Sequence, residues 1–236
     1  MNLRSGRLRY QVQLTDSPAT VTAHAGLPLV IEAFRALGLP EAIREHLHFK
    51  QRVRGYSEVT CVETLVALLA AGGECVDDVR VLHADAGLQR LWGKRALPAA
   101  ETLRTFLNRF HDERAVAARV EHTAFVPAES AGLEALSAVQ VQLVRSLQGR
   151  GPQRHATLDV DANVIPSEKR TALPVYEGGT GYQPLGVWWA ERQVWVTSQF
   201  RDGNVPAQCG VLEIVQASVA TLRGLGVAEL AVRSDS

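Results

Sequence analysis

The sequence contains few cysteines, and their arrangement argues against two common kinds of site. Only Cys61, Cys75 and Cys209 occur among the 236 residues, and they are widely spaced. An odd number of cysteines at such spacing predicts neither a disulfide framework nor a zinc site. We therefore expect a reducing compartment, the cytoplasm.

Long apolar runs are also missing. No stretch of the sequence is long and apolar enough to span a bilayer as a helix. The opening MNLRSGRLRYQVQL carries basic residues but no apolar segment of the kind found in secretory signals. The sequence therefore gives no indication of secretion or of membrane insertion.

The chain has no excess of charge of either sign. It holds 25 Lys+Arg and 25 Asp+Glu, and the balance is 18 against 16 in residues 1–150 and 7 against 9 in residues 151–236. Any contact with DNA must therefore come from local basic patches and not from bulk charge. One small patch is the arm that carries Arg4, Arg7 and Arg9.

The usual signs of several enzyme classes are absent as well. The seven histidines show no spacing typical of metal ligands, and no Gly-x-Ser-x-Gly nucleophile motif is present. Hydrophobic residues make up 46% of the chain and charged residues 21%. This composition is that of an ordinary globular protein.

Apolar residues recur at helical spacing through the first 150 residues. Ser57 is a suitable N-cap for a helix that Gly72 and Gly73 would end. Two short helices are expected on either side of a turn at Gly87. A further helix is predicted over about 29–37, where Gly38 and Pro40 would end it, and another within 97–113. A long helix or a pair of helices is expected from 112 to about 147, with a break or kink at Pro127.

The periodicity changes after the segment QGRGPQR at 148–154, which is the best candidate for a domain boundary. Strand patterns follow at 155–165, 182–190 and 193–200, then a helix that Gly224 and Gly226 would end and a strand at about 227–233. The sequence thus predicts an α/β protein, with a helical region over 1–150 and a β-β-β-α-β region over 151–236. The helix is long enough for a crossover, so the last strand should run parallel to a neighbouring strand.

Two aspartates interrupt the apolar alternation in HATLDVDANVIPSEKR, which begins at His155. Strict alternation is typical of a half-buried strand, so Asp159 and Asp161 should share its polar face, roughly 7 Å apart. Aspartate is depleted in strands, and this placement therefore needs a reason. If the parallel neighbour of this strand is the last strand, Asp235 arrives beside the same two residues.

Converging carboxylates repel one another unless a cation neutralises them. Sites made only of oxygen ligands suit Mg²⁺ or Mn²⁺. Two such ions, roughly 3.5–4 Å apart, activate a water or hydroxyl and stabilise the leaving oxygen in phosphodiester chemistry. A divalent metal site is the function that best explains acids on this strand.

Several segments also carry a resemblance to a known family. They are LDVDAN, the KR pair at 169–170, YEGGTGYQPL, FRDGNVP, the terminal RSDS, and the helical lead-in from GGECVDDVRVLHADAGLQRLWG to LPAAETLRTFLNRF. Together they resemble a bacterial insertion-sequence transposase of the DDE class, which has a ribonuclease H-like catalytic fold. The resemblance covers most of the chain and implies metal-dependent cleavage and transfer of DNA strands at insertion-sequence ends.

The resemblance also implies site residues. The first family aspartate corresponds to Asp161, where Asn163 replaces the usual Ser or Thr, and the second corresponds to Asp235. Asp159 is a further metal-ligand candidate, with Mg²⁺ or Mn²⁺ as the cofactor. The third family acid is a Glu on a later helix that this sequence does not reach. The resemblance therefore implies the N-terminal part of a transposase, which we expect to be inactive by itself.

Double-stranded DNA, at transposon ends and at the target, is the implied partner, with a possible homodimer in a synaptic complex. The candidates for DNA contact are the KR pair and three arginines around a predicted helix: Lys169, Arg170, Arg95, Arg104 and Arg109. Solvated surface charge is the alternative interpretation of all five.

Other interpretations remain open. The chain could be a non-catalytic transposase relic that acts as a DNA-binding module, or a ribonuclease H-like nuclease. Trp188 and Trp189 are adjacent, so one should face the core and the other outward, where packing or stacking on a base are its alternative roles. Asp202 and Gly203 are expected to form a simple turn.

Overall fold

The structure is a computed structural model that describes residues 21–49, 55–93, 96–118, 124, 126 and 128–234. The chain divides into two compact units, Met1–His111 and Asp112–Ser236. No helix in the described ranges has the length and apolar character needed to cross a membrane.

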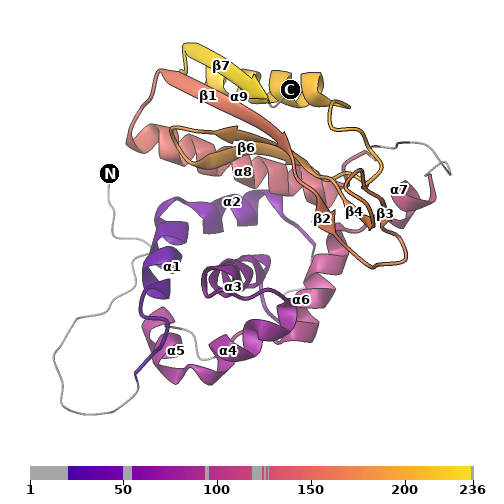
Figure 1. Cartoon of the computed structure of the whole chain (residues 1–236). Helices are drawn as coiled ribbons and strands as arrows, with labels where there is room; N and C mark the ends of the chain where they lie inside the picture. Colours follow the sequence, from indigo (N-terminus) through magenta and orange to yellow (C-terminus); the bar gives the residue numbers. More distant parts are fainter. Residues whose placement is uncertain are drawn as a thin grey trace. The chain divides into compact units, whose positions relative to one another are not determined.

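The first unit is helical, as predicted. Figure 1 shows α3 surrounded by the other helices of this unit, and buried side chains such as Ile31, Leu68 and Leu103 form its core. The elements are α1 (Leu27–Ala36), α2 (Leu39–His46), α3 (Glu58–Ala70), the 3-10 turn η1 (Val76–Asp78), α4 (Val79–Ala84), α5 (Ala86–Trp92), α6 (Ala100–Leu107) and the 3-10 turn η2 (Asn108–Phe110).

Local sequence signals explain most of these helix boundaries. The hydroxyl of Ser57 accepts a hydrogen bond from the backbone N–H of Thr60 at 3.2 Å, which confirms the predicted cap of α3. Gly38 separates α1 from α2 with φ +76°, a conformation that glycine adopts without strain. The helix end predicted at Gly38 is thus confirmed, and a second helix, α2, follows it.

The predicted turn at Gly87 is wrong. Gly87 is buried inside α5, and the chain turns at Asp85 instead. The Asp85 carboxylate caps α5 by accepting a hydrogen bond from the backbone N–H of Leu88 at 2.8 Å. It also accepts one from the hydroxyl of Thr22 and contacts the ring of His24 at 3.1 Å. The start of α5 is therefore set by the side-chain cap of Asp85 and not by Gly87.

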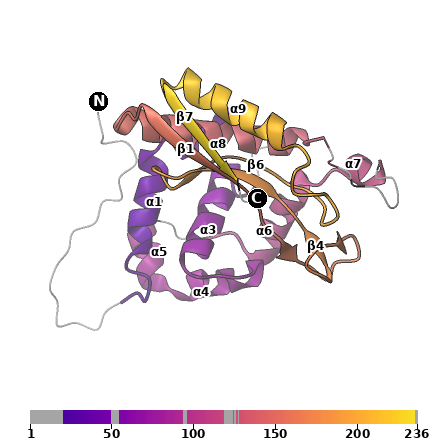
Figure 2. The same ribbon diagram turned by 45° about the horizontal axis from the view of Figure 1, so that its top comes forward.

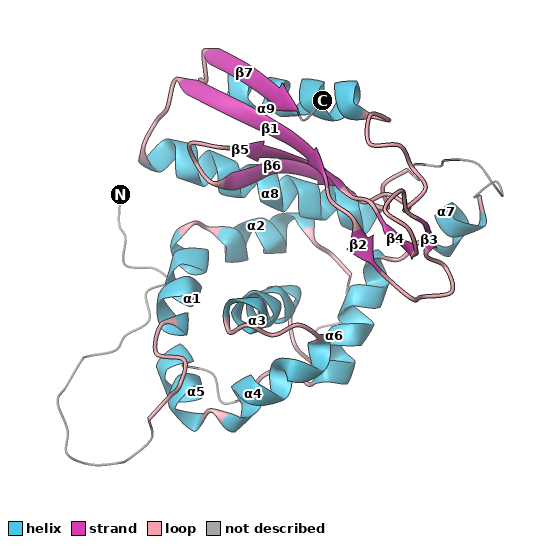
Figure 3. Cartoon of the chain, in the orientation of Figure 1, coloured by secondary structure: helices cyan, strands magenta, loops and turns pink. Residues whose placement is uncertain are grey.

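The second unit contains a four-stranded sheet of order β6-β5-β1-β7. Its elements are α7 (Glu113–Ala117), α8 (Ala131–Arg150), β1 (His155–Ala162), β5 (Leu185–Trp189), β6 (Val194–Gln199), α9 (Val211–Gly224) and β7 (Glu229–Ser234). Strand β1 pairs antiparallel with β5 and parallel with β7 (Figure 3). The predicted β-β-β-α-β order and the parallel last strand are both confirmed.

Helices α8 and α9 cover one face of this sheet, and Figure 2 shows them lying along the strands. Val144 of α8 and Leu222 of α9 belong to the same buried cluster as Leu158 and Trp189 of the sheet. The unit boundary therefore differs from the one expected at 148–154, because helical periodicity does not reveal which element an apolar face will cover.

The segment of sequence that connects β1 to β5 contains three short strands, which form a second small sheet of order β2-β4-β3. They are β2 (Ile165–Pro166), β3 (Leu173–Pro174) and β4 (Thr180–Tyr182). The sequence did not predict β2 and β3 as separate strands, since two residues are too few to show alternation. Gly181 is required in β4, because a Cβ there would lie 2.4 Å from the carbonyl oxygen of Ile165.

Candidate functional site

Strand β1 has one apolar and one polar face, as its alternation predicts. Ala156 and Leu158 are fully buried and Val160 is 7% exposed, while Thr157 and Asp159 are half-buried and Asp161 is exposed. Helices α8 and α9 pack on the buried face. We call the opposite side, which carries the aspartates, the polar face of the sheet.

Asp161 stands near the C-terminal end of β1, opposite Gly186 of β5. Among the described residues its carboxylate has no hydrogen-bond or ion-pair partner. The negative charge of Asp161 acts on Tyr176: the pKa of the Tyr176 phenol is raised mainly by Glu177 and, to a smaller extent, by Asp161. Asp161 is therefore an exposed carboxylate available to a ligand.

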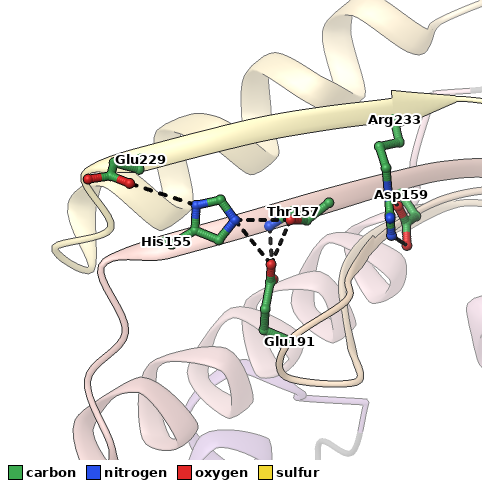
Figure 4. Close-up of polar contacts among 6 residues, drawn as sticks. All are labelled: His155, Thr157, Asp159, Glu191, Glu229 and Arg233. Carbon is green, nitrogen blue, oxygen red and sulfur yellow. Dashed lines mark hydrogen bonds and ion pairs between the residues drawn. The ribbon is translucent and has the colours of Figure 1, made fainter.

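Asp159 forms a two-pronged ion pair with Arg233 of β7 (Figure 4). The guanidinium donates to the two carboxylate oxygens at 2.6 and 2.8 Å. These bonds lower the pKa of Asp159, against a smaller opposing effect of desolvation. Sequence reasoning missed Arg233, since only the register of β1 and β7 brings the two residues together. In this structure the guanidinium of Arg233 neutralises the Asp159 carboxylate.

Asp235 lies outside the described residues, so its predicted approach to Asp161 stays a prediction. The parallel register pairs Val160 with Ser234, and Asp161 and Asp235 are the next residues in each segment of sequence. Within the described part of the chain, no group of three or more His, Cys, Asp or Glu side chains is arranged to hold a metal ion. Of the two aspartates on β1, Asp161 is the one whose carboxylate has no partner among the described residues.

A second polar cluster lies at the other end of β1, where Glu191 in the β5–β6 turn reaches across to it (Figure 4). Glu191 accepts hydrogen bonds from the backbone N–H of Thr157 at 2.9 Å and from its hydroxyl at 2.6 Å. His155 stands 3.2 Å from Glu191 and 4.0 Å from Glu229. Desolvation raises the pKa of Glu191, but the bonds from Thr157 outweigh it and hold the pKa at about 2. No sequence signal marked this cluster.

The predicted DNA contacts Lys169 and Arg170 are exposed in the loop between β2 and β3. The loop is ordered by the backbone, since the carbonyl of Lys169 accepts a hydrogen bond from the N–H of Ala172 at 2.8 Å. Both cations therefore belong to the same unit as Asp161, in the segment that follows β1. Their role in DNA binding stays a prediction.

The three arginines predicted in the helical unit differ in their surroundings. Arg104 is bound to Asp77 and lies 3.6 Å from Glu101. These two acids raise the pKa of Arg104, and the bond to Asp77 contributes most. Arg109 is exposed and lines a cavity of about 410 Å³. Arg95 lies outside the described residues.

The predicted turn at Asp202 and Gly203 is confirmed, since the backbone N–H of Val205 donates to the carbonyl oxygen of Asp202 at 3.2 Å, but the turn lies in a buried polar segment. Arg201 is 0% exposed, Asp202 is 1% exposed and Gln183 is 2% exposed. The Arg201 guanidinium donates to the carbonyl oxygens of Gln183 at 3.1 Å and Cys209 at 2.5 Å. Desolvation lowers the pKa of Arg201. Burial of a charge cannot be read from local sequence, because Arg and Asp in a loop are normally exposed.

One family model matches the chain over nearly its whole length. The model is described as transposase DDE domain group 1, and it matches residues 5–236. No curated protein and no solved structure matches the chain. The resemblance inferred from the sequence motifs is confirmed, and the chain belongs to the transposase DDE domain group 1 family.

Proposed function

We propose that this chain acts in the cleavage and transfer of DNA strands at insertion-sequence ends, with the help of divalent metal ions. The observation that carries the proposal is the parallel pairing of β1 with β7, in the register Val160 to Ser234. This pairing extends to Val160 and Ser234, the residues that immediately precede Asp161 and Asp235 in the sequence. Family membership supports a transposase in general, and the register supports these particular residues.

The sheet topology supports a ribonuclease H-like catalytic fold over 151–236, and we propose that helices within 1–150 bind DNA. Three consecutive antiparallel strands, β1, β5 and β6, are followed by α9 and by β7 parallel to β1. Ligands of α/β sheets bind beyond the carboxyl ends of the strands. Asp161 is at that end of β1, and its side chain is exposed.

In this proposal Asp161 and Asp235 hold Mg²⁺ or Mn²⁺. Carboxylate oxygens suit both ions, and Asp161 fits because no protein cation within the described residues neutralises it. When bound, such ions act as Lewis acids on the phosphate and lower the pKa of an attacking water. Asp159 becomes a third ligand only if Arg233 releases it. While the pair persists, Asp159 holds the guanidinium beside the site.

DNA would be held through its phosphates. Lys169 and Arg170 are exposed cations in the same unit as Asp161, and Arg109 is an exposed cation in the helical unit. We propose phosphate contacts for all three, together with Arg95 and a weaker contribution from Arg104, whose charge two acids already balance. Backbone contacts of this kind position DNA without reading its sequence. Two copies in a synaptic complex remain part of the proposal.

Titration with Mn²⁺ by isothermal calorimetry tests the metal site. The wild-type chain should bind Mn²⁺, Asp161→Ala should lose this binding, and Asp112→Ala should keep it as an exposed control outside the sheet. Asp235→Ala should match Asp161→Ala. Equal binding by the wild type and Asp161→Ala would refute the proposed ligand. Salt-sensitive DNA binding without any bound Mn²⁺ would favour the alternative, a non-catalytic DNA-binding module.

A further inference from the structure

The polar face of the sheet carries an aromatic pair that the proposed chemistry does not use. Trp92 and Trp189 are buried, whereas Trp195 is 38% exposed and Trp188 is half-buried. The rings of Trp188 and Trp195 meet edge to face, with centroids 5.1 Å apart and an interplanar angle of 71°. Two large indoles on a face not covered by α8 or α9 require an explanation.

Strand register places this pair next to the candidate metal ligands. Arg233, Asp159, Trp188 and Trp195 form one row across β7, β1, β5 and β6. Asp161 belongs to the neighbouring row, with Gly186 and Ser198. Successive side chains on one face of a strand lie roughly 7 Å apart, so the two rows are within the span of one nucleotide.

Gly186 shows how the ring of Trp195 is accommodated. A Cβ on Gly186 would lie 2.5 Å from Cζ3 of Trp195 and 2.8 Å from its Cε3. The indole therefore extends across the backbone of β5 at Gly186, toward the row that contains Asp161. The absence of a side chain at this one position lets the ring lie against the sheet beside the carboxylate.

We propose that Trp188 and Trp195 form a stacking surface for an unpaired nucleobase of the DNA end whose phosphate lies at Asp161. This inference rests on the proposed function, and it names the part of the substrate that the site recognises. Aromatic rings stack on any base, so the contact is tolerant of sequence. A base is the ligand that fits, because the adjacent row is proposed to hold a phosphate of the same strand.

The charges of the residues beside Trp188 and Trp195 are compatible with a bound nucleobase. Asp159 is neutralised by Arg233 through two hydrogen bonds, so the indoles do not border an unbalanced acid. Asp161 is the remaining carboxylate next to the pair, and the proposed metal ion neutralises it. Arg233 is 64% exposed and can contact a phosphate from the other end of the row.

The test uses the full chain and a ten-nucleotide oligothymidine, with tryptophan emission as the readout and EDTA present to remove metal ions. The oligonucleotide should quench the wild-type emission. Trp195→Ala should weaken its binding roughly five- to 150-fold, the range for loss of one stacked base. Trp195→Phe should retain most of the affinity. Phe200→Ala, which removes another exposed aromatic side chain, should bind as the wild type does.

Circular dichroism must show that the Trp195→Ala chain is folded, and Trp188→Ala provides a second variant if it is not. Unchanged oligonucleotide affinity in a folded Trp195→Ala chain overturns the proposal. So does a loss of self-association with unchanged affinity, which would assign the surface to a second copy. The metal proposal can fail independently. In that case the wild type would not bind Mn²⁺, while quenching of its emission by the oligonucleotide would still depend on Trp195.

Discussion

Arg233 and Asp159 are 74 residues apart in sequence, yet the guanidinium of one and the carboxylate of the other form two hydrogen bonds across β7 and β1. The pair lies on the polar face of the sheet, one row away from Asp161. It neutralises one of the two aspartates that the strand pattern singles out. The two acids are therefore chemically distinct.

Replacement of Arg233 by Met should raise the pKa of Asp159 toward its ordinary value of 3.8, because the hydrogen bonds that stabilise the carboxylate are lost. Since the pKa of Asp159 is lowered in the folded chain, the pair stabilises the fold above the ordinary pKa. This contribution is lost as the pH falls through the lowered value. Carboxyl ¹³C NMR titration measures the shift. Arg223→Met on α9 is the control, and an unchanged Asp159 titration in Arg233→Met would contradict the pairing.

Glu191→Gln should destabilise the second unit by about 1 kcal/mol, since a neutral amide replaces a charged acceptor that is partly exposed. The pKa of Glu191 is lowered from 4.5 to about 2. The stability difference between wild type and variant should therefore be complete above pH 4.5 and shrink as the pH falls toward 2. Urea unfolding at several pH values measures it. Glu213→Gln, the same substitution at an exposed position on α9, is the control variant.

Gly186→Ala should displace the ring of Trp195, because the added methyl group would lie 2.5 Å from it. We expect a loss of about 1–3 kcal/mol in stability, typical of overpacking, and a changed near-ultraviolet circular dichroism signal from the indole pair. Gly149→Ala in α8 is the matched control, because a Cβ there meets nothing within 4 Å. An unperturbed indole signal in Gly186→Ala would contradict the described ring position.

Asp85→Ala should cost about 1–2 kcal/mol in stability of the helical unit, at the upper end for loss of a helix cap. The same carboxylate also holds Thr22 and His24, so the loss extends beyond α5. Ser57→Ala removes a cap from α3 with one backbone bond and should cost less. Thermal or urea unfolding compares the two variants. A smaller effect for Asp85→Ala would show that the tether to Thr22 and His24 adds nothing.

The salt dependence of DNA binding separates phosphate contacts from solvated charge. Each phosphate contact contributes a slope of about 0.9 in a plot of log K against log salt. The double variant Lys169→Ala, Arg170→Ala should therefore reduce the slope by about 1.8 if both cations contact DNA. Arg104→Ala should reduce it by less, because Asp77 and Glu101 already balance that charge. An unchanged slope in the double variant would assign both cations to the solvated surface.

Local signals predicted a large part of the fold. The cap at Ser57 and the alternation from Ala156 to Val160 depend on residues close together in sequence, and the structure confirms both. The turn at Gly87 failed because Asp85 supplies a stronger local signal through its side chain. Helix α8 was recognised as a helix but not as part of the sheet unit, because its sequence does not specify the surface on which it packs.

The candidate site was predicted only in part, for the same reason. Asp159 and Asp161 were found because a strand gives them one face, and their different surroundings were not found. Nothing near Asp159 in sequence indicates Arg233, and nothing near Thr157 indicates Glu191. These contacts depend on strand register, and a shift of one residue would send each side chain to the other face.

The sequence by itself determined the family of this protein, the helical and sheet-forming regions, and the two aspartates on one strand face, because motifs and periodicity are properties of neighbouring residues. Only the tertiary structure decided that Asp159 is neutralised, that Asp161 has no such partner among the described residues, and that Trp195 lies across Gly186 beside it. These outcomes required strands distant in sequence to pair in one register over a core filled by α8 and α9. That register is set by the packing of the whole unit and not by any local segment.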